Sequence, residues 1–358
     1  LVALVLTGGL LYADHYLTGK MTTDDDFDSL SASDLHQTAT EADGRLGREE
    51  RFSEALSGLE EQLADLPSFT EVDRYLLSNN DIPAEALAKL DTGKAPRSSY
   101  LSSDASKIQV FVLFGLDGVD SSDSVMLVAL DRVHQKIKLI SLARDSYVFI
   151  PEFASFSKLA YSYTWGGAAM AVKNLNYNYY LNVSDYIAVD FDQLAEIIDR
   201  IGGVTVNIDE DEARYLSNYP NVHVGDCLLD GETAVSYARI RKSSATDSDR
   251  KRTGRQREVI LSILNTLQTM PLSQYPRFVR DCLGMCATSF EAETLLTMAA
   301  ETLGQNYTVE QYFFPEGQVD WWAGLIKEYF YYVYDLRRAS DRIYRIIYEE
   351  LYISGYDD

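Results

Sequence analysis

The stretch QVFVLFGLDGVDSSDSVMLVALDRVHQKIKLISLARDSYVFIP, residues Gln109–Pro151, contains three short apolar runs. They are Val110–Leu116, Val125–Leu130 and Ile137–Leu142, and each is bounded by Gly, Asp, Ser or Lys. Short runs rich in Val, Ile, Leu and Phe are typical of central strands that are buried on both faces of a sheet. We therefore expect the three runs to be strands of one sheet, with the first two paired as a hairpin.

Charged side chains follow these predicted strands. Asp117, Asp120 and Asp123 come after the first run, and Arg144 and Asp145 come after the third. In neighbouring strands these residues would converge at one edge of the sheet. Mg²⁺ binds one or two carboxylates together with phosphate oxygens, and arginine forms a bidentate pair with phosphate. The residues therefore suit a divalent cation and a phosphate, and the alternative is that the acidic loop residues are merely solvated.

Composition limits the classes of function. The chain has 358 residues, of which 46% are hydrophobic, and a formal net charge of −23. This length accommodates one large domain with accessory segments. Nucleic acid is disfavoured as a partner because its phosphates are bound by clustered Lys and Arg. The four His are scattered and the three Cys lack zinc-site spacing, so histidine-centred and zinc chemistry have little support.

The N-terminal part of the chain lacks a chemical motif. Leu1–Tyr12 carries no charge but is too short to span a bilayer, because a transmembrane helix needs about 20 residues. The stretch suits the outer end of a transmembrane helix, the remnant of a signal peptide or a buried helix, and the Asp-rich segment after it disfavours the buried helix. We assign residues 1–17 to the end of a membrane anchor helix and residues 18–103 to an acidic spacer with an accessory helical segment.

The second half of the chain contains a basic group of residues. Its members are Arg239, Arg241, Arg252, Arg255 and Gln256. On a helix the last three lie at i, i+3 and i+4 and share one face. Arg239 and Arg241 share a face only in extended chain beyond a helix end. Such a group in an acidic chain fits a pyrophosphate clamp, and the alternative is a solvated helix face paired with Asp249 and Glu258.

Lys158 precedes a pair of glycines, Gly166 and Gly167, after which we expect a helix over Ala168–Leu175. The free amides at a helix N-terminus bind anions, and Lys158 would add a positive charge there. A surface lysine without a role is an equally good interpretation.

The remaining elements are predicted from apolar periodicity. A βαβ-like run is expected over Tyr186–Phe191, Asp192–Ile201 and Val204–Ile208. Further expected elements are a helix continuing over Val259–Met270, helices at Leu272–Leu283 and Phe290–Leu303, a strand at Thr308–Phe314 and a closing helix at Arg337–Leu351. The apolar residues Trp321, Trp322, Leu325, Ile326 and Phe330 exceed what a small core needs. We expect them to be core, and the alternative is that they line an apolar ligand pocket.

Several motifs together resemble the LytR-CpsA-Psr family in order and spacing. They are GLDGVDSSDSVMLVALD, SLARDSYVFIP, KLAYSYTWGG, YIAVDF, IGGVTVNI, LLDGETAVSYARIR and DRKRTGRQREVI, between Asp104 and Leu351. The resemblance implies a catalytic domain over residues 104–358, and we expect an α/β fold with a mixed central sheet of five or six strands and helices on both faces. It also implies a single-pass protein of the cell membrane, anchored by an N-terminal helix, with the catalytic domain extracellular. Such a protein moves a glycopolymer from a polyprenyl-pyrophosphate-linked glycan onto peptidoglycan.

The resemblance also assigns roles to single residues. Asp117 and Asp123 fall on metal-binding acids for Mg²⁺ (or Mn²⁺), and Arg144 falls on the catalytic arginine. Asp145 and Asp120 are candidates for taking the proton of the attacking hydroxyl. The expected pyrophosphate-binding residues are Lys158, Arg239, Arg241, Arg252, Arg255 and Gln256.

The chain departs from the family pattern at three places. Ser121 stands where the family usually has Arg, Ala143 where it has Pro, and Ala160-Tyr161 where it has Asn-His. Two alternatives to a transferase remain, a hydrolase that uses water and a non-catalytic lipid-binding or regulatory module. The loss of one phosphate-binding arginine at Ser121 is the main argument for the non-catalytic module, and nothing in the sequence separates transferase from hydrolase. Retention of Asp117, Asp123 and Arg144 disfavours the non-catalytic alternative.

Overall fold

The structure is a computed structural model that describes residues 101–117, 122–150, 155–241, 245–269, 278, 285–303, 307–316, 319, 321–326 and 329–353. Its centre is a six-stranded sheet with the order β10-β3-β2-β1-β6-β9. The strands are β1 (Ile108–Leu116), β2 (Ser122–Asp131), β3 (Lys136–Leu142), β6 (Tyr186–Asp190), β9 (Ala287–Thr288) and β10 (Thr308–Phe314). The three apolar runs are thus neighbouring strands, as predicted. The predicted anchor, spacer and accessory helices lie outside the described residues.

The sheet is mixed. β1 pairs antiparallel with β2, and β2 pairs antiparallel with β3. β6 and β10 add parallel to β1 and β3, respectively, and β9 adds antiparallel to β6. Parallel neighbours need long crossover connections, which here contain helices. Because β2 and β3 are antiparallel, the end of β3 and the start of β2 meet at one end of the sheet.

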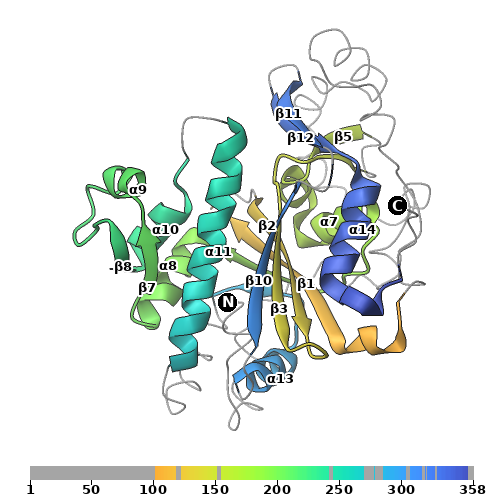
Figure 1. Ribbon diagram of the computed structural model, residues 1–358, viewed down its shortest axis with the longest axis horizontal. Helices are drawn as coiled ribbons and strands as arrows, with labels where there is room; N and C mark the ends of the chain where they lie inside the picture. The colour runs from red at the N-terminus through yellow and green to blue at the C-terminus, as the bar shows by residue number, and fades with distance from the viewer. Residues whose placement is uncertain are drawn as a thin grey trace.

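Helices cover both faces of the sheet (Figure 1). One face packs against α8 (Phe191–Arg200), α10 (Gly231–Ala238) and α11 (Ala245–Thr269), through a core that includes Met126 and Ile263. The other face packs against α7 (Tyr161–Tyr179) and α14 (Leu336–Tyr348), through a core that includes Leu127 and Ile343. Met126 and Leu127 are adjacent in β2, so successive residues enter opposite cores. The predicted α/β fold with helices on both faces is confirmed.

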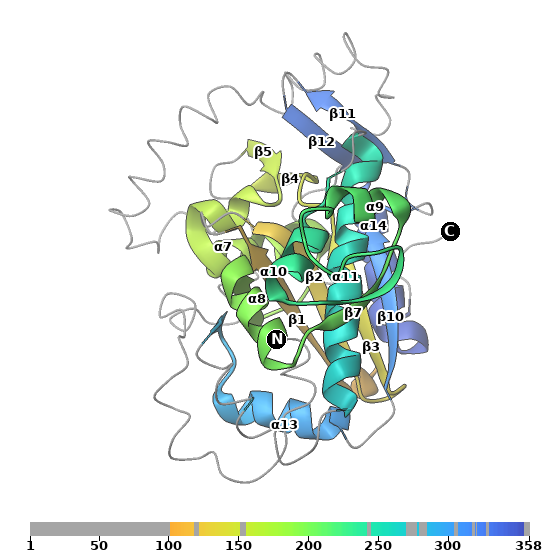
Figure 2. The same ribbon diagram turned by 90° about the vertical axis from the view of Figure 1, so that its left-hand side faces the viewer.

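One expected helix begins earlier than predicted, and the helix expected over Phe290–Leu303 is present and begins at Ala292. α7 begins at Tyr161 rather than at the glycines, which form a kink with φ −147° at Gly166 and φ 62° at Gly167. The positive φ is accessible to glycine because it has no Cβ. α13 (Ala292–Leu303) lies at one end of the sheet (Figure 2). The helix predicted at Leu272–Leu283 lies almost entirely outside the described residues. Among the described helices, none is both long and apolar enough to cross a bilayer.

The predicted βαβ-like run is wrong in one respect. β7 (Val204–Ile208) leaves the central sheet and pairs antiparallel with β8 (Gly225–Leu229), next to α9 (Glu210–Tyr215). The side chains of β7 alternate between buried and exposed. This alternation belongs to a strand with one solvated face, whereas a central strand of this sheet is buried on both faces.

Two further hairpins lie above the end of the sheet (Figure 2). They are β4 (Tyr147–Ile150) with β5 (Ser155–Lys158), and β11 (Trp321–Ile326) with β12 (Tyr329–Tyr334). The expectation that the apolar residues of β11 are core is wrong for Trp321 and Leu325, which are 43% and 53% exposed. An isolated hairpin buries one face, so alternate residues remain in solvent.

The two ends of the described domain lie together. Ser102, next to the short helix η3 (Ser103–Lys107), donates its backbone N–H to the carbonyl of Leu351 at 2.9 Å. Leu351 ends the short helix η6 (Glu349–Leu351), which directly follows α14. The segment that enters the domain is thus attached to the segment that leaves it.

Candidate functional site

The site is built around the buried carboxylate of Asp123 near the start of β2. Gly115 pairs with Ser124, but Leu116 pairs with Ser122, so the register shifts and leaves Asp123 as an extra residue on β2. This is a β-bulge, a feature that redirects a side chain and is common beside active sites. Asp123 is 6% exposed. The bulge therefore directs a buried carboxylate to the end of the sheet.

Three guanidinium groups converge on this carboxylate. Arg144, in the turn after β3, contacts Oδ1 of Asp123 through its Nη1. Arg241, beyond the end of α10, places Nη2 3.3 Å from the same oxygen, and Arg252 on α11 places Nη1 3.7 Å from it. The arginine cluster, which we define as Arg144, Arg241 and Arg252, thus has more positive charge than Asp123 neutralises. Such a site suits a further anion because arginine binds phosphate oxygens bidentately.

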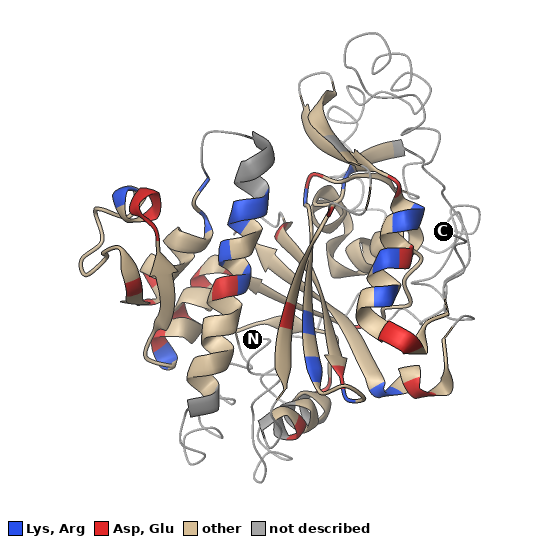
Figure 3. Cartoon of the chain, in the orientation of Figure 1, with Lys and Arg blue, Asp and Glu red and all other residues tan. Residues whose placement is uncertain are grey.

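The arginines differ in exposure. The side chain of Arg252 is 3% exposed, whereas that of Arg241 is 55% exposed. Figure 3 shows the basic residues of α11 concentrated toward its N-terminal half. The structure thus brings Asp123, Arg144, Arg241 and Arg252 together. Arg252 is a fixed member of the cluster, and Arg241 is a solvated one that has room to move toward a ligand.

The turn that carries Arg144 and Asp145 is held by backbone hydrogen bonds to three other elements. These bonds run from Ala143 N to Phe314 O at 2.9 Å, from Ala160 N to Arg144 O at 3.0 Å and from Tyr332 N to Asp145 O at 2.9 Å. The acceptors and donors belong to β10, the residue before α7, and β12. A functional side chain needs such rigid support to keep its geometry.

Asp145 links Arg144 to Lys158. The ammonium of Lys158 lies 2.7 Å from Oδ1 of Asp145, and Nε of Arg144 lies 3.8 Å from Oδ2. Burial, and then the charge of Asp145, raise the pKa of the nearby Tyr161 hydroxyl. Tyr161 therefore stays neutral. Lys158 and Asp145 are therefore connected to Asp123 through Arg144.

A chain of hydrogen-bonded, buried hydroxyl groups supports the turn that carries Arg144 and Asp145. Ser146 Oγ donates to the carbonyl of Ala143 at 2.7 Å and lies 2.8 Å from the hydroxyl of Tyr334. The hydroxyl of Tyr179 on α7 lies 2.6 Å from that of Tyr334. Burial raises the pKa of Tyr179 to about 12. These neutral groups tie α7 and β12 to the turn. No local sequence pattern indicated them, because their partners are remote in the chain.

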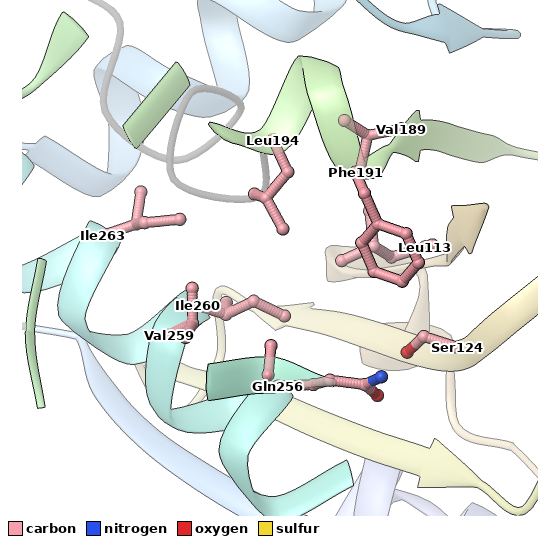
Figure 4. Close-up of a pocket in the computed structure, with 11 residues that line it drawn as sticks. Leu113, Ser124, Val189, Phe191, Leu194, Gln256, Val259, Ile260 and Ile263 are labelled. Carbon is pink, nitrogen blue, oxygen red and sulfur yellow. The ribbon is translucent and has the colours of Figure 1, made fainter. Parts of the chain in front are cut away.

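An apolar cavity of about 60 Å³ lies between the sheet and α8, α10 and α11. It is lined by Leu113, Gly115, Ser124, Val189, Phe191, Leu194, Ala238, Gln256, Val259, Ile260 and Ile263. Figure 4 shows the polar groups of Ser124 and Gln256 near one end and Ile263 at the other. Ser124 follows Asp123 in the chain, and Gln256 lies one turn of α11 beyond Arg252. The polar end of the cavity therefore adjoins the arginine cluster.

Two predicted pyrophosphate-binding residues, Gln256 and Arg239, lie at the cavity. Gln256 is 8% exposed, and its Oε1 has no hydrogen-bond partner among the described residues. A buried carbonyl oxygen without a donor is costly, which is consistent with a place for a ligand or water. The guanidinium of Arg239 lies 4.6 Å from the centroid of the Phe191 ring at the cavity wall. Gln256 therefore lines the cavity, and Arg239 lies against the Phe191 ring in its wall.

Arg255 is not brought to the cluster. Its Nε donates to Oε1 of Glu212 on α9 at 2.6 Å, and its Nη1 donates to the carbonyl of Ile240 at 3.2 Å. Both side chains of this ion pair are buried. Arg255 was correctly predicted to lie on a helix. The carboxylate with which it pairs, however, lies on a separate element. Its predicted pyrophosphate contact has no support in this arrangement.

The predicted metal-binding acids lie at the same end of the β1–β2 hairpin. Asp117 directly follows Leu116, whose partner Ser122 directly precedes Asp123. Two carboxylates supply enough oxygen ligands from the protein for Mg²⁺, which completes its coordination shell with phosphate oxygens and waters. The donor set therefore fits the expected ion. Asp120 and Ser121 lie outside the described residues.

A second group of potential ligands lies at the opposite end of β2. Ligand atoms of Asp131, His134 and Glu349 lie within 4.8 Å of one another. The ammonium of Lys138 lies 2.8 Å from Oδ2 of Asp131 and 2.9 Å from Oε1 of Glu349. A buried ammonium thus already neutralises these carboxylates, and the group is better described as an ion-pair network.

In this α/β protein a buried carboxylate is contacted by three guanidinium groups beside an apolar cavity. Such a site is suited to an anionic ligand with an apolar tail. The chain belongs to the LytR_cpsA_psr family, whose model matches residues 79–343.

Curated relatives carry two kinds of name. The polyisoprenyl-teichoic acid–peptidoglycan teichoic acid transferase TagU of Enterococcus faecalis is 29% identical over 166 residues, which is 44% of this chain and 54% of that protein. The regulatory protein MsrR of Staphylococcus aureus is 31% identical over 163 residues, 44% of this chain and 48% of that protein. The chain thus spans about half the length of these two relatives.

Among solved structures, a LytR-CPS2A-psr family protein, YwtF (TagT), with bound octaprenyl pyrophosphate lipid has a TM-score of 0.53 at 17% identity. The match covers 71% of this chain and 99% of the other. At this identity the likeness shows the shared fold.

Proposed function

We propose that this protein is a transferase that moves a glycopolymer from a polyprenyl-pyrophosphate carrier onto peptidoglycan. The observation that supports this function best is the position of the arginine cluster directly beside the apolar cavity. A polyprenyl pyrophosphate has an anionic head and an apolar tail, which suit these two parts of the site. The name of the TagU relative and the octaprenyl pyrophosphate bound to YwtF point the same way.

Different residues of the site would perform different parts of the reaction. Arg144, Arg241 and Arg252 would bind the pyrophosphate and stabilise the charge on the transferring and leaving phosphates. Gln256 and Arg239 would hold the head group at the cavity, and Asp145 is placed to take a proton. A hydroxyl oxygen of peptidoglycan forms a bond to the sugar-linked phosphorus as the bond from that phosphorus to the polyprenyl-phosphate oxygen breaks. Polyprenyl phosphate is the leaving group.

A divalent cation is part of the proposal. Asp117 and Asp123 would hold Mg²⁺ or Mn²⁺, which supplies charge neutralisation at the pyrophosphate. Asp123 would then bind the cation and the arginine cluster together. Arg241, which is exposed, is the cluster member best able to transfer from Asp123 to the phosphate.

We also propose a membrane-anchored, extracellular location for the full-length protein, because Leu1–Tyr12 is uncharged and precedes an acidic segment. The carrier lipid resides in a membrane, so an anchored enzyme would meet it there. Fractionation of cells that produce the full-length protein tests this location, and recovery in the soluble fraction would refute it.

The decisive experiment offers the protein a polyprenyl-pyrophosphate-linked glycan and peptidoglycan together, with and without Mg²⁺. Covalent attachment of glycan to peptidoglycan, absent from the Arg144→Ala variant, is the expected result. Release of glycan without attachment would identify a hydrolase. An intact carrier under all conditions, with lipid still bound, would support the lipid-binding regulatory module instead.

A further inference from the structure

The arginine cluster has a second neighbour besides the apolar cavity. We define the tyrosine patch as Tyr161 on α7 with Tyr329 and Tyr331 on β12, grouped around Lys158. The Lys158 ammonium lies 5.9 Å from the ring centroid of Tyr161 and 5.6 Å from that of Tyr331. Tyr329 and Tyr331 are two residues apart in β12, so their side chains lie on the same face of this strand. The patch therefore combines aromatic faces with an ion pair, Lys158–Asp145.

The tyrosine patch and the apolar cavity lie on opposite sides of Arg144. The cavity belongs to the sheet face covered by α8, α10 and α11. Tyr161 packs against the core of the other face, which α7 and α14 cover. Arg144 stands at the sheet end between them and contacts Asp123 in one direction and approaches Asp145 in the other.

This arrangement determines where an acceptor can approach. In phosphoryl transfer the attacking and leaving oxygens are roughly in line across the phosphorus. If the leaving polyprenyl phosphate occupies the cavity side, as proposed above, the attacking hydroxyl must come from the opposite side. That side is the one bearing Asp145, Lys158 and the tyrosine patch.

The chemistry of the patch fits a sugar. Tyr161 and Tyr329 are partly exposed, whereas Tyr331 is buried and its hydroxyl has no hydrogen-bond partner among the described residues. The ring of Tyr161 is supported by Trp165, at 5.2 Å between centroids. Rigid aromatic rings with polar tips offer a flat apolar surface together with hydrogen-bonding groups. A sugar ring has the same combination of apolar face and hydroxyl edge.

We infer that the tyrosine patch is the acceptor subsite and that it binds a sugar ring of the peptidoglycan glycan strand. Tyr161 and Tyr329 provide the stacking surface, and Lys158 holds the Asp145 carboxylate toward the attacking hydroxyl. Asp145 takes the hydroxyl proton as the new oxygen–phosphorus bond forms and the bond to polyprenyl phosphate breaks. This inference rests on the proposed transferase function for its direction of attack, but sugar binding by the patch is measurable without the reaction.

The test uses the full chain and a soluble tetrasaccharide of alternating N-acetylglucosamine and N-acetylmuramic acid. Binding is measured by calorimetry without donor, and the acceptor and donor KM values are measured with donor present. Tyr161→Ala should weaken tetrasaccharide binding and raise the acceptor KM about tenfold, in keeping with the loss of one aromatic stacking partner. Tyr161→Phe, which keeps the ring, should bind nearly as wild type does, and the donor KM should not change in either variant.

The matched control is Tyr215→Ala, since Tyr215 is a 59% exposed tyrosine on α9, away from the site. Unchanged tetrasaccharide affinity in a folded Tyr161→Ala protein, or no binding by wild type, would overturn the acceptor assignment. An increase confined to the donor KM would also overturn it and place the donor sugar on the patch. If the tetrasaccharide binds as expected but no carrier is cleaved, the acceptor subsite stands and the transferase proposal fails.

Discussion

The carboxylate of Asp123 and the guanidinium of Arg144 form an ion pair across the end of the central sheet. Asp123 reaches this position because it is the extra residue of a β-bulge, and Arg144 reaches it because the turn after β3 is bonded to three other elements. The pair therefore depends on two separate backbone features. It joins the arginine cluster on one side to the Asp145–Lys158 pair on the other.

Replacement of Arg144 should remove activity without unfolding the protein. Positioning and charge supply most of the rate in phosphoryl transfer, so we expect Arg144→Ala to lower the transfer rate by roughly two or more orders of magnitude. Arg144→Lys should lose a similar amount because lysine keeps the charge but lacks the bidentate fork. Arg214→Ala, at an exposed surface position on α9, is the control. Transfer rates and thermal melting are measured side by side, and full transfer by folded Arg144→Ala would exclude Arg144 from the mechanism.

Replacement of Asp123 should affect both the cation and the stability. Asp123→Ala leaves the arginine cluster without its shared carboxylate, and breaking a buried ion pair costs about 3–5 kcal/mol of unfolding free energy. The exposure of Arg241 places the expected loss at the lower end, so the protein should remain folded. We expect activity and its stimulation by Mg²⁺ to disappear together.

Asp117→Ala separates the two effects of Asp123. It should abolish stimulation by Mg²⁺ while leaving the contacts of Asp123 with Arg144, Arg241 and Arg252 in place. Activity of Asp123→Ala that still rises with Mg²⁺ would contradict the metal assignment. Chemical unfolding monitored by circular dichroism provides the stability comparison.

Filling the apolar cavity should block the lipid. Ile260 is half-buried in the wall of the cavity, so Ile260→Trp would place an indole in a space of about 60 Å³. We expect binding of octaprenyl pyrophosphate to weaken at least tenfold, whereas binding of inorganic pyrophosphate at the arginine cluster should persist. Asn265→Trp, at an exposed position of the same helix, is the control. Equal lipid affinity for Ile260→Trp and wild type would show that the tail lies elsewhere.

The ion-pair network at the far end of β2 should make stability depend on pH. His134 lies 2.6 Å from Asp131 Oδ2 through Nδ1 and 2.8 Å from Glu350 Oε1 through Nε2. Burial lowers the pKa of His134, but the bonds to Glu350 and Asp131 raise it by more, so the net shift is upward from 6.5. Because the pKa of His134 is higher in the folded state than in the unfolded state, protonation of His134 stabilises the folded protein. This stabilisation is complete at pH values below the unfolded-state pKa. This contribution is lost as the pH rises through the folded pKa.

We therefore expect the unfolding free energy to fall as the pH is raised from about 6 through the folded-state pKa of His134. Lys136, Lys138, Glu310 and Glu349 also belong to this network. His134→Gln should flatten the pH dependence, whereas His223→Gln, at an exposed position, should not. Guanidinium unfolding at a series of pH values measures the slope, and an unchanged slope in His134→Gln would refute the assignment.

The sequence alone predicted the central strands and several residues that meet at their end. Local composition is informative here because short apolar runs bounded by turn residues, such as Val110–Leu116, favour buried strands. The position of Arg144 directly after such a run determined that it would lie at a strand end. The helical spacing of Arg252 and Gln256 likewise placed both on one face of α11.

Other features were decided only by tertiary structure. Arg255 has the same local signal as Arg252, but Glu212 on a distant element takes it into a buried ion pair. The hairpin that carries Tyr329 and Tyr331 looked like core from its composition, although it buries one face and joins the site through a backbone hydrogen bond from Tyr332 N to Asp145 O. Whether a charged or aromatic side chain serves a site or a scaffold depends on which partner lies across the fold, and that partner is set by long-range packing rather than by local sequence.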